Sequence, residues 1–87
     1  MIKFNKLYLP SFEKDLKNIK SNFKLQKRLK NKIEEIVENP YHYKPLRNVL
    51  RNRRRVHIGS YVLIFEINVG EKTIIFHTFS HHDQAYD

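Results

Sequence analysis

The sequence predicts an α+β fold, in which an N-terminal strand and a helical hairpin pack on one face of an antiparallel sheet, in the order β-α-α-β-β-β. Two observations carry this prediction. Apolar residues recur with a period near 3.6 in the first half of the 87-residue chain and with a period of 2 in the second half. The two glycines and three prolines fall between these segments. We therefore expect a single domain over residues 1–87.

One strand and two helices are expected in the first half of the chain. Residues 2–9 contain alternating apolar side chains and predict the strand. Apolar residues over 12–19 then recur at helical spacing, which predicts a short helix with Ser11 as its N-cap. A longer apolar stripe over residues 25–38 predicts a second helix, which Pro40 ends. These two helices form the predicted hairpin.

The second half is expected to form three strands, over residues 53–58, 61–69 and 72–81. Gly59 and Ser60 separate the first two strands, and glycine in the first position of a two-residue loop is typical of a type II′ hairpin turn. The middle strand is apolar on both faces, as expected at the centre of a sheet whose helices cover one side.

The formal net charge of +8 indicates an anionic partner. Lysines over residues 14–32 alternate with apolar residues at helical spacing, and we interpret them as a solvent-exposed helix face. A denser basic cluster follows, with no acidic residue between Glu38 and Glu66. Arginine dominates this cluster, and its planar guanidinium suits phosphate. The residues predicted to bind an RNA or ribosomal phosphate backbone are Lys44, Arg47, Arg51, Arg53 and Arg54.

Histidines in the second half of the chain supply acid-base groups beside this positive charge. Cleavage of RNA by attack of a 2′-hydroxyl on the adjacent phosphate needs a base, an acid and fixed positive charge on the phosphorane. Histidine suits both proton roles because its ordinary pKa is about 6.5. Strand alternation puts Arg55 and His57 on the face opposite Val56. By the same alternation, only one of His81 and His82 is expected in the site.

Other aromatic and histidine side chains have a structural interpretation. Tyr61 alternates with Leu63 and Phe65, which predicts a ring in the core. His77 lies in the middle of a strand and is interpreted as structural. His42 lies in a loop, where an aromatic lid over the core is at least as well supported as stacking on RNA.

No metal site and no cofactor are predicted. The chain has no cysteine, no His-x-x-x-His spacing and no cluster of acidic residues. No apolar run approaches the roughly 20 residues that cross a bilayer, and the N-terminus lacks the apolar stretch and cleavage site of a signal peptide. We therefore expect a cytoplasmic protein that does not enter a membrane.

Two motifs carry a resemblance to a known family. Residues 55–67 read Arg-Val-His-Ile-Gly-Ser-Tyr-Val-Leu-Ile-Phe-Glu-Ile, and residues 81–86 read His-His-Asp-Gln-Ala-Tyr. With the preceding helical hairpin, they resemble the RelE/ParE superfamily of toxins from type II toxin-antitoxin systems. The RelE branch of ribosome-dependent mRNA interferases, and its YafQ-like members, are the more similar. RelE-like toxins commonly read Arg-x-Arg-x-Gly-Asp-Tyr-Arg in the first motif, and the matching residues here are Arg55, Gly59 and Tyr61.

The resemblance implies a metal-independent endoribonuclease that cleaves codons in the ribosomal A site. It assigns Arg55 to the phosphorane, His57 and His82 to proton transfer, with His81 as an alternative to His82, and Tyr86 to positioning or stacking on the codon. Two positions depart from the family pattern, because Val62 and His82 stand where many members have arginines.

The resemblance also implies an acidic, RelB-like antitoxin in a hetero-oligomeric complex. It adds the ribosome and mRNA as targets, and operator DNA reached only through the antitoxin. Three alternatives remain: a nucleic-acid binder without activity, a ParE-like member that poisons DNA gyrase, and a catalytically degenerate toxin. The terminal His-His-Asp-x-x-Tyr favours the RelE branch over the ParE branch, whereas Val62 leaves the degenerate toxin open.

Overall fold

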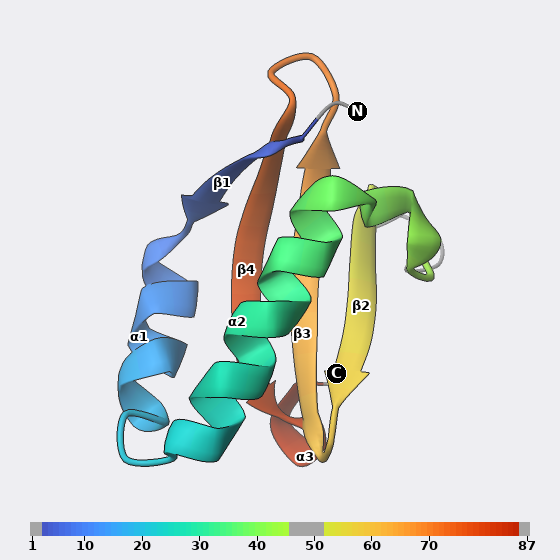
Figure 1. The fold of residues 1–87 in the computed structure, drawn as a ribbon. Coiled ribbons are helices and arrows are strands. Elements are labelled where there is room, and N and C mark those ends of the chain that lie inside the picture. The colour runs from blue at the N-terminus through green and yellow to red at the C-terminus, as the bar shows by residue number, and fades with distance from the viewer. Residues whose placement is uncertain (1–2, 46–51, 86–87) are drawn as a thin grey trace.

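The computed structural model describes residues 3–45 and 52–85 and has the predicted order of elements (Figure 1). The elements are β1 (Asn5–Tyr8), α1 (Pro10–Asn18), α2 (Phe23–Glu38), the 3-10 helix η1 (Pro40–His42), β2 (Arg53–Ile58), β3 (Tyr61–Asn68), β4 (Thr73–His81) and α3 (His82–Ala85). The predicted α+β class is confirmed. The short helices η1 and α3 were not predicted.

The four strands form one sheet in the order β1-β4-β3-β2. β2, β3 and β4 are antiparallel neighbours, as predicted. β1 pairs with β4 in the parallel direction, from Asn5 opposite Thr73 to Tyr8 opposite Phe76, so the sheet is mixed rather than wholly antiparallel. Alternation of apolar residues predicts a strand, but it does not tell whether the neighbouring strand runs parallel or antiparallel to it. The long connection through the helical hairpin allows a parallel pair.

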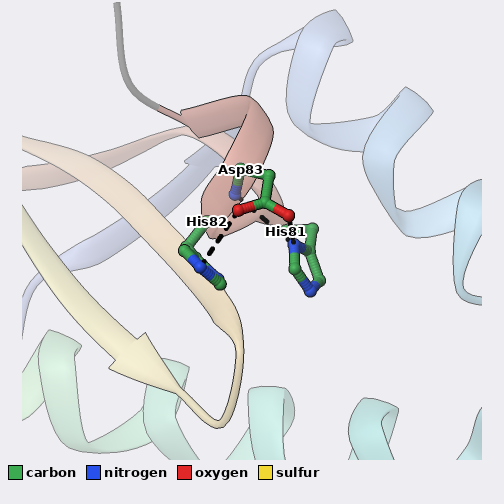
Figure 2. Close-up of side chains that lie close together, drawn as sticks. All are labelled: His81, His82 and Asp83. Carbon is green, nitrogen blue, oxygen red and sulfur yellow. Dashed lines mark hydrogen bonds and ion pairs between the residues drawn. The ribbon is translucent and has the colours of Figure 1, made fainter.

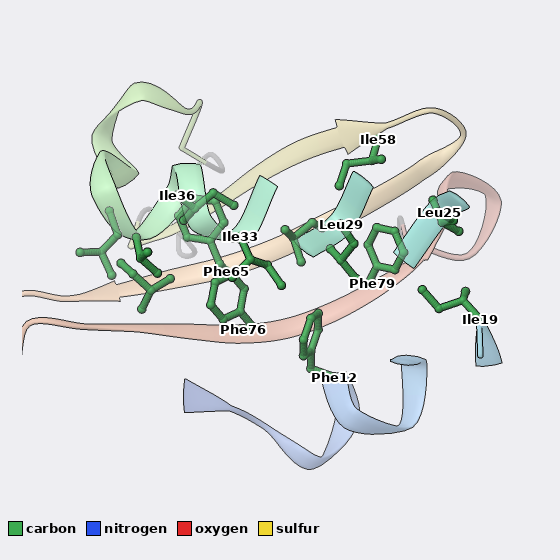
Figure 3. Packing of buried hydrophobic residues seen from close by; sticks show 14 residues of the cluster. Phe12, Ile19, Leu25, Leu29, Ile33, Ile36, Ile58, Phe65, Phe76 and Phe79 are labelled. Atoms are coloured by element: carbon green, nitrogen blue, oxygen red, sulfur yellow. The ribbon is translucent and has the colours of Figure 1, made fainter. Parts of the chain in front are cut away.

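The core lies between the helices and one face of the sheet (Figure 3). Phe76 on β4 is its central ring, with ring centroids 5.5 Å from Tyr8, 5.5 Å from Phe12 and 6.2 Å from Phe65. Helix α2 contributes the predicted stripe, which is buried along its whole length: Leu25, Leu29, Ile33, Ile36 and Val37. The periodicity of these residues therefore reflects a single buried helix face.

Helix α1 closes the part of the β4 edge that β1 leaves unpaired. The pairing of β1 ends at Phe76. Beyond it, the Ser11 hydroxyl donates to the His77 carbonyl at 2.6 Å, and the Phe79 N–H donates to Asp15 Oδ2 at 2.8 Å. These side chains satisfy edge groups of β4 that would otherwise lack partners in the sheet.

The prediction that Ser11 is the N-cap of the first helix was wrong. α1 begins at Pro10, and Leu9 occupies the N-cap position without a side-chain cap. Proline suits the first helical position because its ring fixes φ and it has no N–H to leave unpaired. The cap of the second helix is Asn22, whose side chain accepts a hydrogen bond from the Leu25 N–H at 3.1 Å.

The turn between β2 and β3 has the predicted geometry. Ile58 pairs with Tyr61, which leaves Gly59 and Ser60 as a two-residue loop. Gly59 has a φ of 60°, whereas Ser60 is absent from the described residues with positive φ. A positive φ at the first loop residue alone is the type II′ pattern.

A late ionisation of Tyr43 is expected. Its hydroxyl donates to Glu35 Oε1 at 3.2 Å, and burial together with this bond raises the pKa of Tyr43 from 10.0 to about 12. Because the folded state favours the neutral phenol, the resulting stabilisation is complete below pH 10 and is lost as the pH rises towards 12. Tyrosinate absorbance during an alkaline titration should show one late step, and Tyr43→Phe should remove it. The control Tyr41→Phe should leave that step in place, and loss of the step in both variants would contradict the assignment.

Candidate functional site

The candidate site lies at the end of the sheet where β4 passes directly into α3. The β2–β3 turn and the start of α2 lie at the same end (Figure 1). The His82 N–H, at the start of α3, donates to the Ser60 carbonyl at 2.8 Å. This bond connects α3 to the hairpin turn.

No helix among the residues described is long and apolar enough to cross a membrane.

Both terminal histidines face the Asp83 carboxylate (Figure 2). His82 Nε2 lies 3.1 Å from Asp83 Oδ1, and His81 Nδ1 lies 3.5 Å from Asp83 Oδ2. The two imidazole centroids are 4.7 Å apart. The expectation that the two side chains point to opposite faces was wrong, because strand alternation ends at His81 and the helical turn that follows brings His82 to the same side. Which of the two acts in the site stays a prediction.

His82 is held at both ring nitrogens. Its Nδ1 lies 3.2 Å from the Ser60 carbonyl oxygen, and its Nε2 faces the Asp83 carboxylate. A carbonyl and a carboxylate only accept hydrogen bonds, so an N–H on either ring nitrogen has an acceptor beside it. The His82 side chain is 50% exposed, so it remains open to a substrate.

Arg53, Arg55 and His57 lie on the face of β2 that points away from the helices. Val56 and Ile58 pack into the core, so strand alternation sends the other three side chains outwards. The predicted division of the two faces is confirmed. The register places His57 opposite Val62, and Val62 opposite Ser80, along one row across the sheet.

Val62 is fully buried on that outer face. It occupies the position where the RelE pattern commonly has an arginine, so the sheet presents an apolar side chain there. The positive charge of this face therefore comes from β2.

The structure separates Arg54 from the other arginines of β2. Its Nη1 donates to the Tyr43 carbonyl at 2.7 Å, and its guanidinium lies 5.3 Å from the Tyr41 ring centroid. Among the described residues, its buried Nε has no hydrogen-bond partner. The register places Arg54 opposite the core residue Phe65. Its guanidinium is therefore directed at the segment after α2, away from the outer face.

Lys44 is exposed beside β2, and its carbonyl accepts a hydrogen bond from the Arg55 N–H at 3.2 Å. It therefore stands at the edge of the sheet that carries the arginines. The predicted residues Arg47, Arg51 and Tyr86 lie outside the described residues.

Tyr61 links the core to the site. Its ring stacks on Phe79 with centroids 5.0 Å apart and meets His81 edge-on at 5.7 Å. It is half-buried and packs against the core, as expected. His77 lies 2.8 Å from Glu66 Oε1 through its Nε2, which supports its structural interpretation.

Sequence reasoning gave Asp83 no role of its own, although it directly follows the two histidines and is an acidic residue at a helix start. It also missed Arg28, whose guanidinium lies against the β2–β3 turn. A Cβ at Gly59 would stand 3.3 Å from Arg28 Nη1. Nothing in the spacing of the sequence indicates this approach, because it depends on how α2 packs on the sheet.

The terminal cluster also carries potential metal ligands. One ligand atom each from His81, His82 and Asp83 lie within 4.8 Å of one another, and such a set could hold a metal ion. Two imidazoles and a carboxylate are common ligands of zinc. The prediction of a site without metal therefore needs a direct test, which a chelator provides.

Comparisons with known proteins agree with the fold and the motifs. A family model described as the ParE toxin of the type II toxin-antitoxin system parDE matches residues 7–86. The chain is 45% identical over 80 residues to a Methanocaldococcus jannaschii protein that bears the toxin name RelE4, which covers 90% of this chain and 85% of that protein.

Two solved structures share the fold at low sequence identity. The Escherichia coli DinJ–YafQ toxin-antitoxin complex matches with a TM-score of 0.80 and 20% identity, over 99% of this chain and 100% of that chain. The Mycobacterium tuberculosis RelBE2 toxin-antitoxin complex matches with a TM-score of 0.78 and 18% identity, over 92% of this chain and 99% of that chain. The resemblance stated from the motifs is confirmed. The chain belongs to the ParE toxin family within the RelE/ParE superfamily, and it is a type II toxin-antitoxin toxin with the RelE/YafQ fold.

Proposed function

We propose that this toxin is a metal-independent endoribonuclease that cleaves mRNA in the ribosomal A site and so inhibits translation. The single observation that carries the proposal is the His81–His82–Asp83 cluster, held by Ser60 at the end of a sheet whose outer face carries arginines and His57. Acid-base groups beside fixed positive charge are what phosphodiester cleavage requires.

The proposed reaction is an internal transfer. His57 takes the proton of the 2′-hydroxyl, and the 2′-oxygen attacks the adjacent phosphorus. Arg55 stabilises the anionic phosphorane through charge-assisted hydrogen bonds. His82 gives its Nε2 proton to the 5′-oxygen, which replaces the Asp83 carboxylate as the acceptor while the phosphorus–oxygen bond breaks. This leaves a 2′,3′-cyclic phosphate and a 5′-hydroxyl. The Ser60 carbonyl keeps the ring in orientation through Nδ1. Flanking phosphates are bound by Arg53, Lys44, Arg47 and Arg51, with Arg54 at their margin, and Tyr86 lies on the codon.

An acidic, RelB-like antitoxin is the proposed partner. The two similar solved structures are both toxin-antitoxin complexes, and the net charge of +8 on this chain suits an acidic protein that covers it. We expect a hetero-oligomer that reaches operator DNA through the antitoxin. Action on ribosomes places the toxin in the cytoplasm.

A specific observation favours one alternative, a ParE-like or degenerate toxin that does not cleave RNA. The matching family model is that of ParE, and Val62 fills the usual arginine position with a buried apolar side chain. Such a toxin would act by binding a target such as DNA gyrase.

The test uses the purified chain, freed of antitoxin, with programmed ribosomes carrying a defined codon in the A site and with naked mRNA in parallel. Cleavage is expected on ribosomes alone and should leave a 2′,3′-cyclic phosphate at the mapped cut. It is expected to persist when the toxin has been treated with EDTA and then freed of the chelator before it meets the ribosomes, which are kept in Mg²⁺ throughout. Loss of cleavage after this treatment, restored by Zn²⁺, would assign the terminal cluster to a metal. Absence of cleavage together with inhibition of gyrase supercoiling would support the ParE-like alternative.

A further inference from the structure

We propose that the groove between the start of α2 and the β2–β3 turn is a nucleotide-binding subsite for single-stranded RNA. Arg28 and Lys24 would hold a phosphate next to the scissile one, and Phe23 and Tyr61 would stack on the bases. The groove has a volume of about 360 Å³, and both cations, the turn and Tyr61 line it. This inference rests on the proposed function for the identity of the ligand as RNA.

The two cations share one face of α2. Lys24 and Arg28 are four positions apart in the chain, so their side chains stand one above the other on the helix. Both residues are exposed. Within the described part of the chain, neither has a hydrogen-bond or ion-pair partner, and the first turn of α2 contains no acidic residue. Their charge is thus uncompensated and is available to a phosphate.

Gly59 allows the Arg28 guanidinium to approach the turn closely. A Cβ at this position would meet Arg28 Nη1 at 3.3 Å, which is tighter than ordinary contact. The next residue, Ser60, accepts the hydrogen bond from the His82 N–H. Arg28 and His82 therefore flank the same two-residue turn, and one RNA strand that crosses the turn can touch both.

Two aromatic side chains border the adjoining hollow. Phe23 and Tyr61 line it together with Lys24. Phe23 is 77% exposed, which is unusual for a large apolar side chain at a helix start. Tyr61 is fixed by its stacking on Phe79. Aromatic rings next to cations are the means by which proteins bind single-stranded nucleic acid without reading its sequence.

The subsite also supplies positive charge at positions where the sheet has no arginine. Val62 and His82 stand at two positions where RelE-like toxins commonly have arginines, and Val62 is buried. A guanidinium supplied by α2 at the same end of the sheet restores positive charge beside the site.

The test measures binding of a short 2′-O-methyl oligoribonucleotide, which has no 2′-hydroxyl to attack, by NMR titration and fluorescence anisotropy at several salt concentrations. Arg28→Ala should weaken binding about tenfold and should lower the slope of log affinity against log salt by about 0.7, the loss of one phosphate contact to a single strand. Phe23→Ala should weaken binding about tenfold and leave the salt slope unchanged.

Lys27→Ala is the matched control, because it removes one charge from the same exposed helix outside the groove. It should weaken binding less than about twofold. Equal effects of Arg28→Ala and Lys27→Ala, or no binding by the unaltered toxin at millimolar oligonucleotide, would overturn the subsite. If the toxin cleaves nothing on ribosomes but the Arg28 and Phe23 variants bind as described, the subsite stands and the proposed activity fails.

Discussion

Replacement of His82 by alanine is expected to lower the rate of RNA cleavage on ribosomes about 10²–10⁴-fold, the usual contribution of a positioned general acid or base. The physical reason is the way this ring is held. The Ser60 carbonyl lies 3.2 Å from Nδ1 and the Asp83 carboxylate lies 3.1 Å from Nε2. The loss should appear in kcat, with a much smaller change in the affinity for ribosomes, because the side chain acts mainly on the transition state.

The same measurement separates the two adjacent histidines. His81 makes longer contacts, at 3.4 Å from the Asp83 N–H and 3.5 Å from Asp83 Oδ2. His81→Ala is therefore expected to cost less activity than His82→Ala. Asp83→Asn, which keeps the shape of the side chain but removes its charge, should give an intermediate loss. If His81→Ala has the larger effect, the two histidines exchange roles.

His42→Ala is the matched control for these variants. His42 is exposed in η1, at the end of the molecule opposite α3 (Figure 1). Its removal should leave the cleavage rate unchanged within about twofold. An equal loss of rate in all the histidine variants would indicate an effect on folding and would remove the argument for His82.

The sequence determines the elements well where burial creates a periodic pattern. β2 has the predicted bounds, and β3 and β4 differ from the predicted ranges by one residue at one end. The apolar stripe of α2 is likewise the buried face. In each case the period follows from one side of the element facing the core, which is a property of the local sequence.

Features that depend on tertiary neighbours could not be predicted from the spacing of apolar residues. The parallel pairing of β1 with β4 joins two segments from opposite ends of the chain. The Ser11 hydroxyl acts on β4 instead of capping its own helix, because an edge carbonyl of His77 lies within reach. Neither interaction changes the spacing of apolar residues in the segments that make it.

The candidate site shows the same division. Alternation along β2 correctly placed His57 on the outer face. The same alternation puts Arg54, three residues earlier, on the core side of the strand. The same rule failed at His82, where the backbone changes from strand to helix. Arg28 could not be found from the sequence, because its approach to Gly59 requires the packing of α2 on the sheet.

Phe76→Ala is expected to lower the free energy of unfolding by about 3–5 kcal/mol, the range for removing a buried aromatic ring from a core. The Phe76 side chain is fully buried, and its ring contacts come from three other elements, through Tyr8 on β1, Phe12 on α1 and Phe65 on β3. Since a chain of this length has a total stability of roughly 4–13 kcal/mol, the loss is a large share of it. Urea unfolding followed by circular dichroism measures the change.

The matched control is Phe23→Ala, which deletes the same atoms from a side chain that is 77% exposed at the start of α2. Its effect on stability should stay within about 0.5 kcal/mol. A similar loss from both variants would show that the ring cluster around Phe76 is not the centre of the core. Because Phe76 and His81 lie on the same strand, β4, loosening of this strand should also reduce cleavage in conditions where Phe76→Ala remains mostly folded. Phe23→Ala retains the packing of β4, so any loss of cleavage that it causes should come with weaker RNA binding and a change in unfolding free energy within about 0.5 kcal/mol.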